Sequence, residues 1–327
     1  MKRRRVATIE WLRLFPNDGF LPQTEQTLDT AAECSETVKK AVTGAGDGDA
    51  LRNVWVVRSL RRIVLVLVAA AAFAAAGMDA RAAAPAPLRI ALPEGWSARQ
   101  MADRVAEVRR IAIRTRGVTP RLTGTAYRRA TAAALPPRAF ARLVKRRSVE
   151  GFLFPDTYEF TPTTSAANLV ARQLAVFERR WRTVDLRVAR SRGLDPYEVL
   201  IVASLVERET VVPRERALVA AVIANRLDEG MPLGIDASLR YGLGIEGTRP
   251  ITRAHLRSST PYNTHRFKGL PPTPIGNPGL ASIRAAARPA SVDHLFYLRI
   301  PGTLRHFFTA DEQEFCAKAL EFGYAGC

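Results

Sequence analysis

The sequence predicts an α+β protein in which a small module of strands and helices precedes a mostly helical domain. Leu88, Ile90 and Leu92 alternate with other residues, which is the pattern of a half-buried strand. The stretch 148–160, SVEGFLFPDTYEF, alternates again. Between residues 196 and 227, apolar side chains instead recur three and four positions apart, as they do on packed helices. Strands that flank helices, followed by a run of helices, are typical of an α+β architecture.

The chain divides into four parts by composition. Residues 1–57 are polar and without periodicity, and we expect a disordered segment or an extension of the gene model. Residues 58–78 combine three arginines with the apolar run 63–76, which predicts a membrane anchor or a signal segment with the remainder of the chain outside. The run is short for a spanning helix, so both alternatives stay open. Residues 88–160 form the predicted module, and 161–327 the helical domain.

The formal net charge of the 327 residues is +18, and the excess is densest between Arg99 and Arg147. Such a surface favours polyanions: anionic lipid headgroups, anionic wall polymers or nucleic acid. A solvated face without a partner is the alternative. The sequence contains no zinc-finger spacing and no RNA-binding strand motif, and the four histidines have no paired-ligand spacing. We therefore expect no nucleic acid partner, no metal and no cofactor.

Within the module, a turn at Pro93–Gly95 separates the first strand from a helix that Ser97 caps. Met101 and Val105 mark the buried side of this helix. The stretch 135–144, LPPRAFARLV, is the predicted second helix of the module. The module is therefore expected to run strand, helix, helix, strand.

The most informative helix runs from residue 196 to 209. Asp195 is its predicted N-cap, and Glu198 completes a capping box. Glu207 follows Ala203 by four residues and therefore shares a face with small, mostly apolar side chains. A carboxyl held there has a raised pKa, as a general acid requires. Glu209 lies about 200° around the helix axis and cannot share that face.

A series of motifs follows this helix. Asn225 lies on the next helical run, Asp236 and Tyr241 come after it, and TPYNTH spans 260–265. The segment GLPPTPIGNPG spans 269–279, and FYL at 296–298 and RHFFT at 305–309 close the series. In this order and spacing, residues 149–309 resemble the catalytic domain of the endolytic murein transglycosylases, the YceG-like family.

The resemblance implies the site. It places Glu207 at the family's catalytic glutamate, so we expect Glu207→Gln to lower turnover by at least about 10²–10⁴-fold and Glu209→Gln to be far milder. Residues 88–160 resemble a LysM-like subdomain, which binds glycan or serves only for packing. The expected substrate-binding residues are Asn225, Asp236, Tyr241, Tyr262, Asn263, Thr264 and His306. Pro and Asn also favour turns, Tyr241 also fits the core, and a core histidine is the alternative for His306.

The resemblance implies cleavage of MurNAc–GlcNAc bonds in peptidoglycan without water. A single glutamate suffices if it protonates the leaving oxygen and then deprotonates the sugar's own C6 hydroxyl, which yields a 1,6-anhydro end. Asp236 is the rival second carboxylate, and a hydrolytic muramidase is the first alternative. A catalytically silent peptidoglycan-binding membrane protein is the second. Family members have Gln and Pro around this Asp, whereas the chain reads LGIDAS.

The family also implies a location and partners. Its members are single-pass inner-membrane proteins with the catalytic domain outside, so we expect the membrane, peptidoglycan strands and cell wall synthases as partners. On that side Cys316 and Cys327 either form a disulfide or remain free thiols.

Overall fold

The computed structural model describes residues 87–144, 146–245 and 249–324. Residues 85–327 cluster as one compact unit. The predicted membrane segment and the polar segment before it lie outside the described residues. Among the described residues, no helix is both long and apolar enough to cross a membrane.

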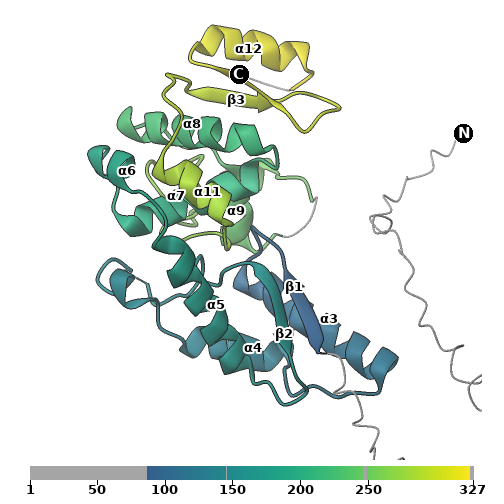
Figure 1. Ribbon diagram of the computed structural model, residues 1–327. Coiled ribbons are helices and arrows are strands. Elements are labelled where there is room, and N and C mark those ends of the chain that lie inside the picture. The colour runs from purple at the N-terminus through teal and green to yellow at the C-terminus, as the bar shows by residue number, and fades with distance from the viewer. Residues whose placement is uncertain (1–86, 145, 246–248, 325–327) are drawn as a thin grey trace, which may run out of the picture. The chain divides into compact units, whose positions relative to one another are not determined.

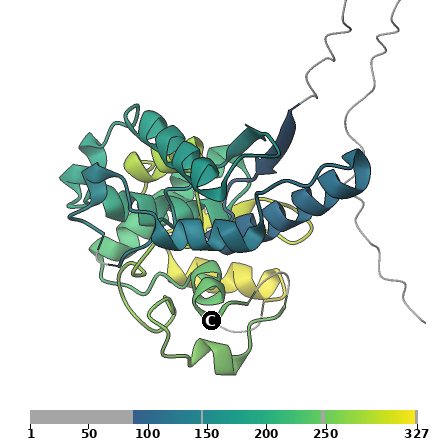
Figure 2. The same ribbon diagram turned by 90° about the horizontal axis from the view of Figure 1, so that it is seen from below.

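The strand module lies at one end of this unit (Figure 1). Strand β1, Leu88–Leu92, pairs antiparallel with β2, Asp156–Phe160, so that Leu88 faces Phe160 in the register. Helices α3, Ala98–Arg116, and α4, Gly124–Ala133, connect them and pack side by side (Figure 2). The capping box predicted from Ser97 is present, with Gln100 as its second member.

The prediction of a helix over 135–144 is wrong. The structure has only a 3-10 turn there, Arg138–Phe140, and the module's second helix is α4, which Thr123 caps. Pro136 and Pro137 explain the difference, because neither can donate a backbone N–H and the residue before a proline avoids the helical region. The strand predicted over 148–160 is also shorter than expected. Gly151, with φ of 89°, turns the chain, and pairing begins at Asp156.

The helical part follows the module. Its helices are α5, Ala166–Trp181; α6, Arg187–Ser191; α7, Pro196–Glu209; α8, Arg216–Asp228; α9, Asp236–Leu243; α10, Arg253–Leu256; and α11, Leu280–Ala287. A 3-10 turn, Pro213–Glu215, precedes α8. At the other end of the unit, β3, Phe296–Arg299, and β4, His306–Thr309, form an antiparallel hairpin, and α12, Glu312–Glu321, packs on it (Figure 1).

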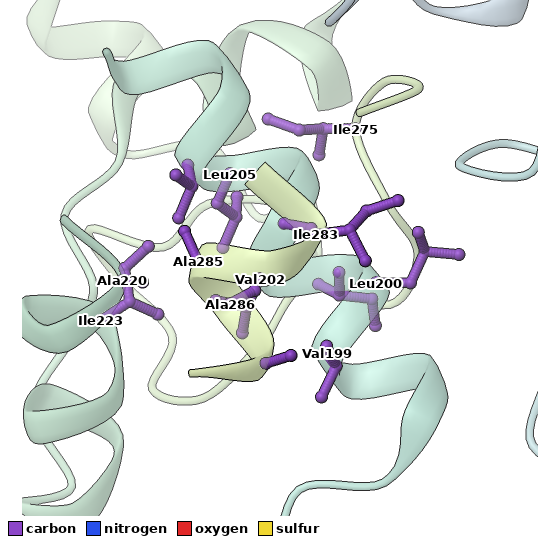
Figure 3. Close-up of a cluster of buried hydrophobic side chains, with 14 of the residues drawn as sticks. Val199, Leu200, Val202, Leu205, Ala220, Ile223, Ile275, Ile283, Ala285 and Ala286 are labelled. Carbon is purple, nitrogen blue, oxygen red and sulfur yellow. The ribbon is translucent and has the colours of Figure 1, made fainter. Parts of the chain in front are cut away.

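Helix α7 is the centre of the larger core. Every residue from Val199 to Val206 is buried, and the labelled side chains of α7, α8 and α11 pack together in Figure 3. Its start confirms the sequence prediction, because the Asp195 side chain accepts from the backbone N–H of Glu198 and the Glu198 side chain accepts from that of Asp195. Ser204 anchors the loop before α11, since its hydroxyl accepts the backbone N–H of Ile275 at 3.0 Å. The core thus fixes the far end of α7, where the charged residues begin.

Candidate active site

The C-terminal turn of α7 presents two glutamates to different surroundings. Glu207 and Glu209 are two residues apart on a helix, so their side chains leave the axis in nearly opposite directions. Both side chains lie among the described residues, and they differ in their charged neighbours and hydrogen-bonding partners.

Glu207 is held by contacts with two other helices. Its side chain is 6% exposed, its Oε1 lies 3.8 Å from Arg216 Nη2, and its Oε2 accepts the backbone N–H of Gly279 at 2.9 Å. Gly279 caps the start of α11, where a negative charge is favoured by the helix dipole. Arg216 also donates to the Ser282 hydroxyl on α11. Glu207 therefore links α7, α8 and α11 through partners that bind a carboxylate.

The turn between β1 and α3 packs directly on Glu207. Gly95 donates its N–H to the Asn277 carbonyl at 2.8 Å, and Asn277 donates its own to the Trp96 carbonyl at 3.0 Å. A side chain at Gly276 would place its Cβ 2.4 Å from the Gly95 carbonyl oxygen, so only glycine permits this approach. Burial and the nearby charge of Glu207 raise the pKa of Glu94, against the effect of Arg216. The contacts of Gly95 and Trp96 with Gly276 and Asn277 form a joint that attaches the module to the helical part.

Glu209 has the properties of an acid. It is partly exposed, and burial, with a smaller contribution from the Asp236 charge, raises its pKa. The Tyr297 hydroxyl donates to Oε2 at 2.8 Å, which opposes that rise. Oε1 has no partner among the described residues. Glu209 thus combines a raised pKa, as a general acid requires, with an oxygen for which the described residues supply no partner.

The hairpin β3–β4 supplies one wall beside Glu209. His306 Nδ1 lies 2.8 Å from Glu215 Oε2, and both side chains are buried, at 8% and 5% exposed. The Glu215 oxygen also receives the Thr210 hydroxyl at 3.3 Å. The Tyr297 ring meets the His306 ring edge to face, with 5.6 Å between centroids. His306, which was predicted as a substrate-binding residue, is therefore part of this wall and contacts Glu215 and Tyr297.

Asp236 lies near Glu209 from a different element. It is the first residue of α9, its side chain is 60% exposed, and its Oδ1 lies 2.8 Å from His265 Nε2. Its charge acts on both Glu209 and Tyr297. The structure thus groups Asp236 and His306 with Glu209 and not with Glu207.

The other predicted contact residues hold loops in place. The Asn263 amide is buried and donates to the carbonyls of Leu256 and Ser258. The buried Thr264 hydroxyl accepts the backbone N–H of Ile235 at 2.9 Å and so positions the residue before Asp236. These hydrogen bonds are typical of turns and loops, which was the alternative to the predicted contact with glycan.

Tyr262, Tyr241 and Asn225 also have intramolecular partners. The Tyr262 hydroxyl pairs with Thr273 at 2.8 Å. Tyr241 meets the Tyr262 ring edge to face and donates to Glu150 at 3.1 Å, so it belongs to the packed interior. Asn225 donates to the carbonyls of Val292 and His294, which fastens the segment before β3 to α8.

Glu150 is a buried carboxyl at the joint between module and helical part. It accepts the N–H of Ala98 at the start of α3, the Asn277 amide at 2.7 Å and the Tyr241 hydroxyl. Burial raises its pKa to about 7, although these hydrogen bonds act in the opposite direction. Its position makes the joint sensitive to protonation near neutral pH.

Tyr297 and Glu215 are not among the residues predicted from the sequence, and Glu209 was expected to matter less than Glu207. The FYL and RHFFT motifs carried a signal, because alternation places Tyr297 and His306 on one hairpin. Contact between that hairpin and the end of α7 is not visible in spacing. Among the described residues, no group of three or more His, Cys, Asp and Glu side chains could hold a metal ion. Cys316 is disulfide-bonded, and its partner lies outside the described residues.

Comparison with known proteins places these features in a family. A model of the YceG-like family matches residues 68–321. An endolytic murein transglycosylase of Bacillus subtilis (strain 168) is 32% identical over 154 residues, which are 47% of this chain and 42% of the relative. One from Streptococcus pneumoniae (strain ATCC BAA-255 / R6) is 31% identical over 157 residues, 47% of this chain and 28% of the relative. The chain thus spans less than half the length of these relatives.

A solved structure agrees with this match. The crystal structure of a YceG-like protein from Listeria monocytogenes superposes with a TM-score of 0.57 and 26% identity, over 71% of this chain and 76% of that chain. The sequence resemblance to this family is therefore confirmed, as is the mixed helix and strand architecture. Because the family model covers most of its length, the chain belongs to the YceG-like family.

Proposed function

We propose that this chain is an endolytic peptidoglycan lytic transglycosylase, and that Glu209, rather than the Glu207 expected from sequence, is its general acid. The relatives it matches are named endolytic murein transglycosylases, and murein is peptidoglycan. The observation that carries the assignment is the carboxyl of Glu209, which has a raised pKa, one oxygen bonded to Tyr297 and one oxygen without a partner among the described residues. Glu207 is instead committed to Arg216 and to the start of α11.

The reaction needs no second protein carboxylate. Glu209 donates its proton to the oxygen of the MurNAc–GlcNAc bond as that bond breaks, and becomes a carboxylate. The C6 hydroxyl of the same MurNAc attacks its own C1, and its proton passes to Glu209, which restores the acid. The new end is 1,6-anhydroMurNAc, about 18 mass units below a hydrolytic product because no water is added.

A matched pair of variants tests the assignment. Glu209→Gln keeps the size of the side chain but cannot exchange a proton, so we expect turnover on purified sacculi to fall by about 10²–10⁴-fold. Glu207→Gln is expected to lower stability, because it weakens the pair with Arg216, and to retain the anhydro product. Mass spectrometry of the released muropeptides measures activity, and thermal unfolding measures stability. Near-normal turnover by Glu209→Gln with an inactive, folded Glu207→Gln would return the role to Glu207.

A hydrolytic muramidase is the second candidate, because Asp236 is exposed and its charge acts on Glu209. In that mechanism Asp236 activates water or forms a covalent intermediate, and reducing ends appear. Asp236→Asn separates the two reactions. We expect anhydro ends to persist in this variant, with the basic limb of the pH profile moved to lower pH, since loss of the Asp236 charge lowers the pKa of Glu209. Loss of all cleavage together with reducing ends in the wild type would favour the hydrolase.

The location and the role of the module are also proposals. The basic residues before the apolar run 63–76 support an anchored protein whose catalytic part lies outside the inner membrane. A phosphatase fused after Pro87 should then be active, and fractionation should find the full chain in the membrane. The strand–helix–helix–strand order supports a LysM-like module, and its arginines are compatible with anionic wall polymers. Cell wall synthases are proposed as partners on family membership.

A further inference from the structure

The hydroxyl of Tyr297 forms a hydrogen bond with one of the two carboxyl oxygens of Glu209, the proposed acid. Tyr297 lies on β3, and its OH donates to Glu209 Oε2 at 2.8 Å. Burial, together with the charge of Glu209, raises the pKa of Tyr297 well above its ordinary value, so the phenol stays neutral and acts as a donor. This contact crosses from the C-terminal hairpin to the end of α7, 88 residues apart in the chain.

The Tyr297 ring is held in place by the same wall. The His306 ring meets it edge to face, and the Phe308 ring lies 5.9 Å away between centroids at an interplanar angle of 37°. His306 is fixed in turn by two bonds to Glu215, one from Nδ1 at 2.8 Å and one from its backbone N–H at 3.2 Å. The phenol therefore has little freedom to leave the carboxyl.

We propose that Tyr297 is a positioning residue for the general acid: its hydroxyl holds Glu209 Oε2, so that Oε1 carries the proton and faces the glycosidic oxygen. The inference rests on the proposed function, since it assigns a helper to the same acid. The Glu215–His306 pair supports Tyr297 and has no contact with the reacting atoms in this scheme.

The arrangement explains how one carboxyl can serve twice. While Glu209 is protonated, the hydrogen bond from Tyr297 leaves Oε1 as the oxygen that bears the proton. When that proton has moved to the leaving oxygen, the bond stabilises the resulting carboxylate and keeps Oε1 directed at the sugar. The proton of the C6 hydroxyl then returns to Oε1 as the bond from O6 to C1 forms. The proton count is unchanged over the cycle.

The pH dependence of the reaction reports on this contact. Asp236, His306 and Arg208 are the other charged groups that act on Glu209. Tyr297 favours the ionised carboxyl, so loss of its hydroxyl raises the pKa of Glu209 and keeps the acid protonated to higher pH. In Tyr297 variants that lack the hydroxyl, the basic limb of the pH profile, where activity falls as the acid loses its proton, should therefore move to higher pH. Loss of a residue with a merely structural role would not cause this shift.

Tyr297→Phe in the full chain tests the proposal, because it keeps the ring that packs on His306. We expect kcat on sacculi to fall by about 10²-fold, the order of loss for a misplaced reacting group. KM should change little, and the basic limb of the pH profile should move to higher pH. The matched control is Tyr127→Phe, which also removes a buried hydroxyl, the donor to Gln173 at 2.6 Å, but in α4 of the module. The control should leave the limb where it is.

A second measurement covers the case in which Tyr297→Phe does not fold. Incorporation of a ring-fluorinated tyrosine at position 297 makes the phenol a stronger donor of nearly the same shape, and should move the basic limb to lower pH. An unmoved limb in a folded variant, with kcat within about twofold of the wild type, would overturn the positioning role. Glu209→Gln is measured in the same assay. If Glu209→Gln is inactive while the limb of the Tyr297 variant does not move, only the role of Tyr297 is refuted. If Glu209→Gln is active, the proposed role of Glu209 as the general acid is refuted.

Discussion

Protonation of Glu150 should make the stability of this protein depend on pH between about 5 and 8. The carboxyl is 5% exposed at the joint between the module and the helical part, and its pKa is about 7 against an ordinary 4.5. The folded state therefore holds this proton more tightly than the unfolded chain does. The stabilisation is fully present below pH 4.5 and is lost as the pH rises through 7.

The magnitude follows from the two pKa values. A difference of one in pKa corresponds to about 1.4 kcal/mol, so ionisation of Glu150 should lower the free energy of unfolding by about 2–3 kcal/mol between pH 5 and pH 8. Glu150→Gln tests this, because the neutral amide can accept from Ala98 and Asn277 through its oxygen, and can donate to the Tyr241 hydroxyl through its nitrogen.

Urea unfolding of both proteins at pH 5, 6, 7 and 8 is the assay, since other groups titrate equally in the two. The wild type should lose about 2–3 kcal/mol more than Glu150→Gln across this range. Parallel pH dependences would refute the reasoning, and would mean that Glu150 is ionised in the folded state throughout.

Two further predictions concern positions that the structure makes specific. Gly276→Ala should lower the free energy of unfolding by about 1–3 kcal/mol, because its Cβ would lie 2.4 Å from the backbone oxygen of Gly95, which cannot turn away. Gly279→Ala is the control in urea unfolding and should cost less, since its Cβ meets the exposed side chain of Glu94, which can rotate; equal costs would contradict this account of the joint. Asp195→Ala should cost about 1 kcal/mol by loss of the cap of α7, and an unchanged melting temperature would show that packing alone sets that end of the helix.

Local pattern was sufficient for the elements whose cause is local. Asp195 and Glu198 start α7, Ser97 starts α3, and β1 follows the alternation from Leu88 to Leu92. Each depends on side chains a few residues apart, so the sequence contains the whole interaction. The helix predicted over 135–144 was wrong for a local reason as well, because Pro136 and Pro137 disfavour a helix there.

The choice between Glu207 and Glu209 could not be predicted from the sequence. Helical periodicity separates Glu207 from Glu209 by about 200°, and that geometry holds, but it does not say which direction leads to a substrate. The apolar face that favoured Glu207 is covered by Gly95 and by the start of α11, from sequence positions more than 70 residues away in either direction. Burial and the contacts with Arg216 and Gly279 give Glu207 a structural role.

By itself, the sequence determined the α+β class, the start of the central helix, and the motifs by which the YceG-like family is identified. These depend on composition, periodicity and the order of residues along the chain. Only the tertiary structure decided which carboxyl has Tyr297, His306 and Asp236 for neighbours, because those residues come from β3, β4 and α9. The protonation of a carboxyl depends on burial and on the charges and donors within a few ångströms, and for Glu209 nearly all of these are supplied by distant parts of the chain.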